Sequence, residues 1–147
     1  MGGGYSVRRG GLEDVLQVHR RISELRPPGS AEDYRAKIDG RDYLALIAEC
    51  SHGPAGFKLG YGVSETVFYS WLGGVDPDYR GRGIAQALLH EQERSAAAMG
   101  YTMIQVKSMN RYPAMLHLLL SNGYLITGHE ADDDPIAAKI VFSKKLC

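Results

Sequence analysis

The spacing of apolar positions changes several times along this chain, and each change predicts a different element. Residues Tyr5–Arg9 alternate weakly between apolar and polar, which predicts a first strand. From Leu12 to Leu25 apolar residues recur at helical spacing, which predicts an amphipathic helix. His19 falls on the apolar face of that helix, so we expect it to be packed in the core rather than to act as a ligand.

A short second helix and three strands are predicted next. The stretch "RPPG" breaks the first helix, and Ser30 with Asp33 forms a capping-box pattern for a helix through Ile38. The segments "DYLALIAEC", "FKLGYGVS" and "TVFYSWLGGV" have the composition of strands, and "SHGPAG" is predicted to be a turn between the first two. Three consecutive strands predict an antiparallel meander.

The second half of the chain alternates helices and strands. From Gly83 the apolar period becomes 3.6, which predicts a long helix ending near Gly100. A strand "YTMIQVK", a helix "PAMLHLLLSNG" and the strands "YLITGHE" and "IAAKIVFSKKL" follow. The long helix should form a right-handed crossover between two parallel strands. The predicted fold class is α/β (α+β), with a mixed, mostly antiparallel central sheet of about seven strands and four helices on its faces.

Length, charge and cysteine content narrow the function classes. The 147 residues fit one domain spanning 1–147, with residues 1–4 as a flexible lead-in. Seventeen basic residues balance seventeen acidic ones, so we expect neither nucleic acid nor a membrane as partner. The two cysteines, Cys50 and Cys147, have no metal-ligand spacing, so no metal is expected. No membrane-span or signal pattern is recognised, and the chain is predicted to be cytoplasmic.

The stretch "VDPDYRGRGIAQALL" has the features of an anion-binding loop. Pro77 cannot donate to a sheet ladder, so the preceding strand should end there. Gly81 and Gly83 lack side chains, so successive backbone N–H groups can surround an anion together with the first amides of the next helix. Arg80 and Arg82 add charge-assisted hydrogen bonds to phosphate. The stretch predicts a diphosphate site; a solvated basic turn and an RNA-contacting element are the alternatives.

This loop, the run from Asn110 to Tyr124 and the order of elements resemble the GNAT superfamily of N-acetyltransferases over nearly the whole chain. The loop contains the R/Q-x-x-G-x-G/A pattern as "RGRGIA". The resemblance implies that acetyl-CoA is the co-substrate, that loop amides bind its pyrophosphate, and that the preceding strand pairs with the pantetheine arm. It assigns cofactor binding to Gly74, Val75, Arg80, Gly81, Arg82, Gly83, Ile84, Ala85 and Asn110, although helix capping alone also explains Asn110.

Room for the pantetheine arm requires that the strand "TMIQVK" splays away from the strand that ends at Val75. Backbone groups left unpaired by this separation would be satisfied by pantetheine amides. Gly73 and Gly74 permit either a β-bulge or the close approach of a ligand.

The groups for proton transfer are less clearly marked. Many members of the family carry a glutamate about eleven positions before the residue matching Arg80, where this chain has Tyr69. The nearest acids are Glu65 and Glu49; Glu65 is the candidate general base, with a solvated strand-end charge as the alternative. Leu119 occupies the place of the family's tyrosine acid. Tyr112 is therefore the candidate acid, and simple packing is its alternative.

The sequence thus predicts an acyl-CoA-dependent N-acetyltransferase that acts on a primary amine of a small molecule or peptide. Direct transfer in a ternary complex is favoured, because no cysteine lies where an acyl-enzyme would be expected. The connection "RPPGS", with Tyr61, Tyr69 and Trp71, is expected to select the acceptor. A non-catalytic acyl-CoA-binding module and an RNA-contacting domain remain as alternatives. Exposed strand edges near the C-terminus are compatible with a homodimer.

Overall fold

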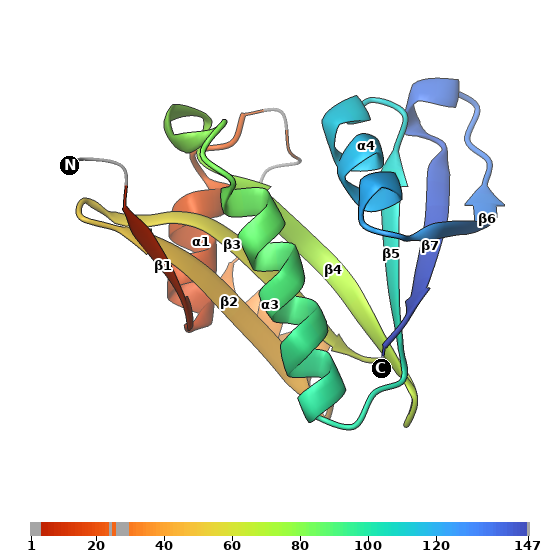
Figure 1. Ribbon diagram of the computed structural model, residues 1–147, viewed down its shortest axis with the longest axis horizontal. Helices are drawn as coiled ribbons and strands as arrows, with labels where there is room; N and C mark the ends of the chain where they lie inside the picture. The colour runs from red at the N-terminus through yellow and green to blue at the C-terminus, as the bar shows by residue number, and fades with distance from the viewer. Residues whose placement is uncertain (1–3, 24, 26–29, 147) are drawn as a thin grey trace.

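A seven-stranded sheet runs through the computed structural model, which describes residues 4–23, 25 and 30–146. Its order is β1-β2-β3-β4-β5-β7-β6 (Figure 1). Among the described strands, β4 and β5 form the one parallel pair. This confirms the predicted parallel pair on either side of the long helix and the predicted antiparallel meander. The strands are β1 (Tyr5–Arg9), β2 (Tyr43–Cys50), β3 (Gly53–Gly62), β4 (Val67–Val75), β5 (Met103–Met109), β6 (Leu125–Glu130) and β7 (Lys139–Lys145).

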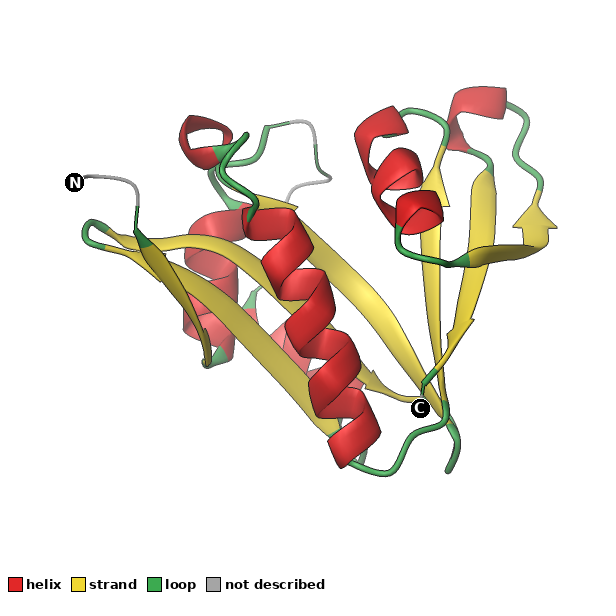
Figure 2. Cartoon of the chain, in the orientation of Figure 1, coloured by secondary structure: helices red, strands yellow, loops and turns green. Residues whose placement is uncertain are grey.

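Four α-helices cover the two faces of the sheet (Figure 2). The helices α1 (Leu12–His19) and α2 (Ala31–Ile38) lie on one face, while α3 (Ile84–Ala98) crosses β1 to β4 on the other and α4 (Pro113–Ser121) packs against β5. Strand β2 shows why both faces need cover: Leu44 and Leu46 enter the core beneath α3, and Ala45 and Ile47 enter the core beneath α1. The predicted mixed fold is confirmed.

Three predicted boundaries are wrong by three residues or more. The last strand begins at Lys139 rather than at Ile136, because residues Pro135–Ala137 form a 3-10 turn. Helix α1 ends at His19 rather than near Leu25, and the chain continues in three-residue turns in which the Ile22 N–H donates to the His19 carbonyl at 3.1 Å. Ile22 is still buried although it lies beyond the end of the helix. The apolar spacing that predicted a longer helix therefore reflects burial and not helical structure at these residues. The turn predicted for "SHGPAG" is also too long, because β3 begins at Gly53. A bulge at Ala55 of β3, opposite Ala48 and Glu49 of β2, lets the hairpin pair that far.

Local chemistry fixes the first two helices as expected. The Ser30 hydroxyl accepts a hydrogen bond from the Asp33 N–H at 3.2 Å, and the Asp33 carboxylate accepts from the Ser30 N–H at 2.9 Å. These contacts complete the predicted capping box. His19 is buried, with Nδ1 2.7 Å from the Tyr34 hydroxyl, which confirms the prediction of a packed histidine. Residues 1–3 of the predicted lead-in and 26–29 of "RPPGS" lie outside the described residues.

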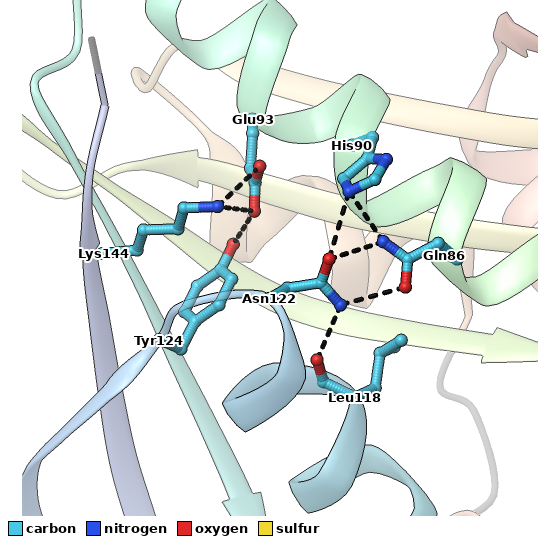
Figure 3. A network of polar contacts seen from close by, with 7 residues as sticks. All are labelled: Gln86, His90, Glu93, Leu118, Asn122, Tyr124 and Lys144. Carbon is cyan, nitrogen blue, oxygen red and sulfur yellow. Dashed lines mark hydrogen bonds and ion pairs between the residues drawn. The ribbon is translucent and has the colours of Figure 1, made fainter.

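Polar contacts join α3 to the C-terminal part of the fold (Figure 3). Gln86 and Asn122 form a reciprocal amide pair, with N···O distances of 2.5 and 2.9 Å. Farther along α3, Glu93 accepts from the Tyr124 hydroxyl at 2.8 Å and from the Lys144 ammonium at 3.2 Å. Burial, together with the Glu93 carboxylate, raises the pKa of Tyr124. The phenol therefore stays protonated and keeps donating to Glu93.

Candidate functional site

Strands β4 and β5 separate like the arms of a V. Their pairing stops after four residue pairs, the last of which joins Ser70 to Val106. Beyond that point residues 72–75 of β4 pair with β3 and residues 107–109 of β5 pair with β7. One edge of β4 therefore carries backbone groups that meet no other strand among the described residues, which confirms the predicted splay. We call the space between the two strands the β4–β5 gap.

A β-bulge lies just before the predicted glycine pair. In β4, Ser70 faces Gly60 and Leu72 faces Leu59, so Trp71 is the extra residue. The bulge is therefore not at Gly73 and Gly74. The latter glycine instead permits a close approach within the protein, because a Cβ atom there would lie 2.5 Å from Ile22 Cδ1.

Buried polar contacts hold the loop that follows β4. Asp76 is 5% exposed, and its carboxylate accepts from the Asp78 N–H at 3.0 Å and from Arg21 Nη1 at 3.2 Å. The same Arg21 nitrogen donates to the Pro54 carbonyl at 2.9 Å. These contacts fasten the start of the loop to β3 and to the end of the first helical region. The chain then forms a short 3-10 turn at residues 77–79.

The two loop glycines adopt left-handed backbone torsions. Gly81 has φ +77° and Gly83 has φ +81°, a region that costs other L-residues about 1–2 kcal/mol. Gly83 is the N-cap of α3, which has no acidic residue in its first turn and no side-chain cap. Within the described residues, the N–H groups of residues 81–85 donate to no protein acceptor. They form a row of free donors at the positive end of the α3 dipole.

The loop arginines are exposed and partly occupied. Arg80 Nε donates to the Val75 carbonyl at 3.3 Å, and its backbone N–H reaches the Pro77 carbonyl at 3.5 Å. The Arg82 guanidinium lies over the Tyr79 ring, 5.1 Å from its centroid. The free amides thus begin after Arg80, and the charge of Arg82 lies beside them.

The structure does not bring the predicted base candidates to the β4–β5 gap. Glu65 is exposed in the turn before β4; since a strand rises about 3.3 Å per residue, it lies roughly 30 Å from the loop that follows the nine-residue β4. Glu49 lies on β2, where its carboxylate accepts a hydrogen bond from Arg8 Nε at 2.5 Å. Neither position supports a direct role in proton transfer.

The two residues predicted near the start of α4 have different positions. Tyr112 is half-buried and is itself the N-cap residue of α4, three residues after the end of β5. Asn110 does not cap that helix: its amide donates to the Pro135 carbonyl at 3.0 Å, tying the end of β5 to the segment before β7. Leu119, which stands in the family's tyrosine position, is fully buried.

Sequence reasoning missed a buried amine beside the gap. Lys58 of β3 is 4% exposed, and its Nζ donates to the Ser70 hydroxyl at 3.2 Å. Desolvation by burial lowers the pKa of Lys58 to about 8, although Glu93 acts in the opposite direction. A signal was present in the sequence, because the lysine interrupts an otherwise uncharged strand "GPAGFKLGYG".

Aromatic side chains gather on the face opposite α3. Trp71 contacts Tyr34 of α2 and Tyr61 of β3 edge-on, with ring centroids 5.6 and 5.9 Å apart. Tyr61 is buried, whereas Tyr69 and Trp71 are partly exposed. Burial raises the pKa of Tyr69 to about 12. The predicted aromatic set therefore contains one core residue and two partly exposed residues.

Other classes of site find no support in the described part of the chain. No group of three or more His, Cys, Asp or Glu side chains is placed to hold a metal ion there. Cys50 lies on β2, which β3 separates from β4, and Cys147 lies outside the described residues. No helix of the described chain is both long and apolar enough to cross a membrane.

Comparisons with known proteins point to one family. Residues 41–124 match the family model described as "Acetyltransferase (GNAT) domain". The ribosomal-protein-S18-alanine N-acetyltransferase from Escherichia coli has a TM-score of 0.81 at 18% identity, over 97% of this chain and 94% of that chain. A GNAT superfamily phosphinothricin acetyltransferase from Sinorhizobium meliloti, in complex with AcCoA, has a TM-score of 0.76 at 18% identity, over 99% and 89%. At these identities the structural likeness shows the fold.

Proposed function

Because this chain belongs to the GNAT acetyltransferase family, we propose that it transfers an acetyl group from acetyl-CoA to a primary amine of a small molecule or peptide. The acyl donor binds along the open edge of β4, with its pyrophosphate at the N-terminus of α3. The amine approaches from the opposite face, where Tyr69 and Trp71 are partly exposed. Both substrates are bound together when the acetyl group moves.

The observation that carries this proposal is the continuity between the open edge and the free amides. The unpaired part of β4 runs directly into the loop whose N–H groups lack protein acceptors in the described chain. An elongated ligand that has amides at one end and a diphosphate at the other matches both features. Gly74 and Val75 then pair with the pantetheine arm, and the amides and arginine of residues 81–85 bind the pyrophosphate.

Direct transfer fits the position of Cys50, and it limits the choice of acceptor. Cys50 lies on β2, which β3 separates from β4, so we favour direct transfer over an acyl-cysteine intermediate. Among the described residues no acid is placed as a base, so the amine must arrive largely neutral. A lysine-like amine of pKa about 10.4 is rarely neutral at pH 7, whereas an α-amine of pKa about 8 is neutral in roughly one molecule in ten. We therefore favour α-amines and other weakly basic amines.

Calorimetry with acetyl-CoA tests the first half of the proposal. We expect saturable binding to the intact chain and an increase in Tm on adding acetyl-CoA, with no increase on adding a single-stranded oligonucleotide. Stabilisation by the oligonucleotide alone would support the RNA-contacting alternative and remove the proposal.

Release of CoA thiol with a panel of amines tests the second half. α-Amines should release thiol faster than lysine side-chain analogues at pH 7, and the difference should narrow as the pH rises. Binding of acetyl-CoA without thiol release from any amine would instead identify a non-catalytic acyl-CoA-binding module.

A further inference from the structure

The Lys58 ammonium lies at the closed end of the β4–β5 gap. Lys58 faces Gly73 of β4 across the sheet, and its Nζ donates to Ser70, the last residue of β4 that pairs with β5. It shares the α3 face of β3 with Gly56, whose Cβ position would lie 2.9 Å from Ile84 Cγ2. The amine is therefore enclosed between α3 and the point where the two strands part.

Gly73 leaves only backbone between this amine and the gap. A Cβ atom at Gly73 would lie 3.2 Å from Lys58 Cγ and 3.4 Å from Lys58 Nζ. A larger side chain would have to share this space with the ammonium. The glycine thus keeps Nζ next to the part of β4 along which the acyl donor is proposed to lie.

The charges around Lys58 leave its ammonium only weakly compensated. Glu93 of α3 is the carboxylate whose charge acts on it, and Glu93 is already paired with Tyr124 and with Lys144 of β7. Within the described residues no carboxylate lies within ion-pair distance of Lys58 Nζ; its partner is the Ser70 hydroxyl. Burial therefore dominates and lowers the pKa of Lys58 to about 8. Such an amine is largely protonated at pH 7 and gives up its proton readily.

We propose that Lys58, held by Ser70, donates the proton that the CoA sulfur requires when the thioester is cleaved. The inference rests on the proposed acetyl transfer. The acceptor nitrogen forms a bond to the carbonyl carbon, and the carbon–sulfur bond breaks with its electron pair remaining on sulfur. The ammonium proton moves to sulfur and yields CoA thiol. The proton lost by the acceptor nitrogen returns to the neutral Lys58 amine, so the ammonium is restored.

Ionisation of the CoA thiol bound to the protein tests this directly and needs no acceptor. The thiolate absorbs short-wavelength ultraviolet light that the thiol does not, so its formation can be followed, against the protein alone as blank, as the pH is raised with CoA at saturation. Below about pH 8, where Lys58 is still charged, a cation beside the sulfur favours the thiolate, so the comparison is made in that range. We expect the ionisation constant of bound CoA to be at least about tenfold larger in the wild-type protein than in Lys58→Met.

Two variants serve as controls. Lys144→Met removes an amine paired with the same Glu93 but outside the gap, and it should leave the thiol ionisation within about twofold of wild type. Tyr112→Phe tests the other candidate donor. A change in the ionisation constant of bound CoA in Tyr112→Phe, with no change in Lys58→Met, would assign proton donation to the tyrosine and overturn the proposal.

The remaining outcomes separate this inference from the proposed function. Equal ionisation constants in wild type and Lys58→Met, with CoA bound by both, overturn the role of Lys58 but not acetyl transfer. Absence of CoA binding in calorimetry overturns both. If Lys58→Met does not fold, the comparison of bound with free CoA in the wild-type protein decides: an unchanged or weaker thiol acidity on binding overturns the inference. With an amine that the wild-type protein acetylates, Lys58→Met should lower kcat on the order of 10²-fold while the KM for acetyl-CoA stays within about twofold.

Discussion

Gly83 is required by its backbone torsion rather than by crowding. Its φ is +81°, and the nearest atom to a Cβ built there would be the Tyr5 hydroxyl oxygen at 3.6 Å, an ordinary contact. Its carbonyl accepts from that hydroxyl at 3.2 Å, so β1 helps to fix the orientation of the peptide. A side chain at this position would disturb the loop amides without filling a cavity.

Gly83→Ala should therefore weaken acetyl-CoA binding more than the same substitution at a glycine with a left-handed torsion elsewhere in the chain. Alanine at any glycine with a left-handed torsion should destabilise the fold by about 1–2 kcal/mol. Only at Gly83 does relaxation of that torsion also turn backbone amides away from the proposed pyrophosphate site. We expect the Kd of acetyl-CoA to rise roughly tenfold or more in calorimetry. Gly40→Ala is the matched control, since Gly40 has φ +70° and open space around it. An equal rise in Kd in both variants would contradict the assignment of the loop.

At the scale of elements, β4 combines two kinds of strand in one segment. Its first half is an interior strand paired on both sides, and its second half is paired on one side. The Trp71 bulge lies at the change and puts Trp71 and Leu72 against the core beneath α1. The loop after β4 is then held by Asp76 and Arg21 rather than by a strand partner.

Arg21→Met should loosen this anchor and weaken cofactor binding without unfolding the protein. Removing the guanidinium leaves the buried Asp76 carboxylate with one partner fewer and frees the Pro54 carbonyl. We expect faster amide hydrogen exchange at residues 76–83 and a rise in the Kd of acetyl-CoA of about three- to tenfold. The neighbouring exposed Arg20→Met is the control and should change neither quantity. Unchanged exchange in Arg21→Met would show that the loop does not depend on this contact.

The order of the elements and the glycine loop were predictable because each depends on short-range signals. Period-3.6 and period-2 spacing marked the helices and strands, and Gly81 and Gly83 marked the loop. The Trp71 bulge and the early start of β3 were not predictable, since both depend on how two strands align. The Lys58–Ser70 contact was missed for the same reason: its partners are twelve residues apart and meet only in the folded sheet.

At the scale of the whole molecule, two unequal parts meet along a short seam. The part with β1 to β4 and the part with β5 to β7 are joined by four residue pairs between β4 and β5, by the α3 connection, and by the polar contacts of Gln86 and Glu93. We call this junction the seam. The buried Lys58 lies in this seam, where its desolvation opposes folding. The pH dependence of global stability should therefore report on it.

Lys58→Met should stabilise the protein most at neutral pH. The pKa of Lys58 is about 8 in the folded protein and about 10.4 when unfolded, so the folded state binds fewer protons between these values. The contribution of Lys58 to the free energy of unfolding thus rises with pH from about 8 to 10.4 and is at its lowest, constant value below pH 8. Urea titrations should show Lys58→Met more stable by roughly 2–4 kcal/mol at pH 7, with the gap closing by pH 10.5. A gap that does not depend on pH would argue against the lowered pKa.

The four-residue ladder between β4 and β5 also works as a ruler. A pantetheine arm that lies along the unpaired segment of β4 can extend only as far as Ser70 and Val106, where pairing with β5 begins. Adding or removing one rung would move that stop by about 3.3 Å relative to a phosphate anchor that stays in place. In the proposed complex, the length of the acyl carrier is therefore limited by the number of residue pairs between β4 and β5 rather than by the lining of a pocket.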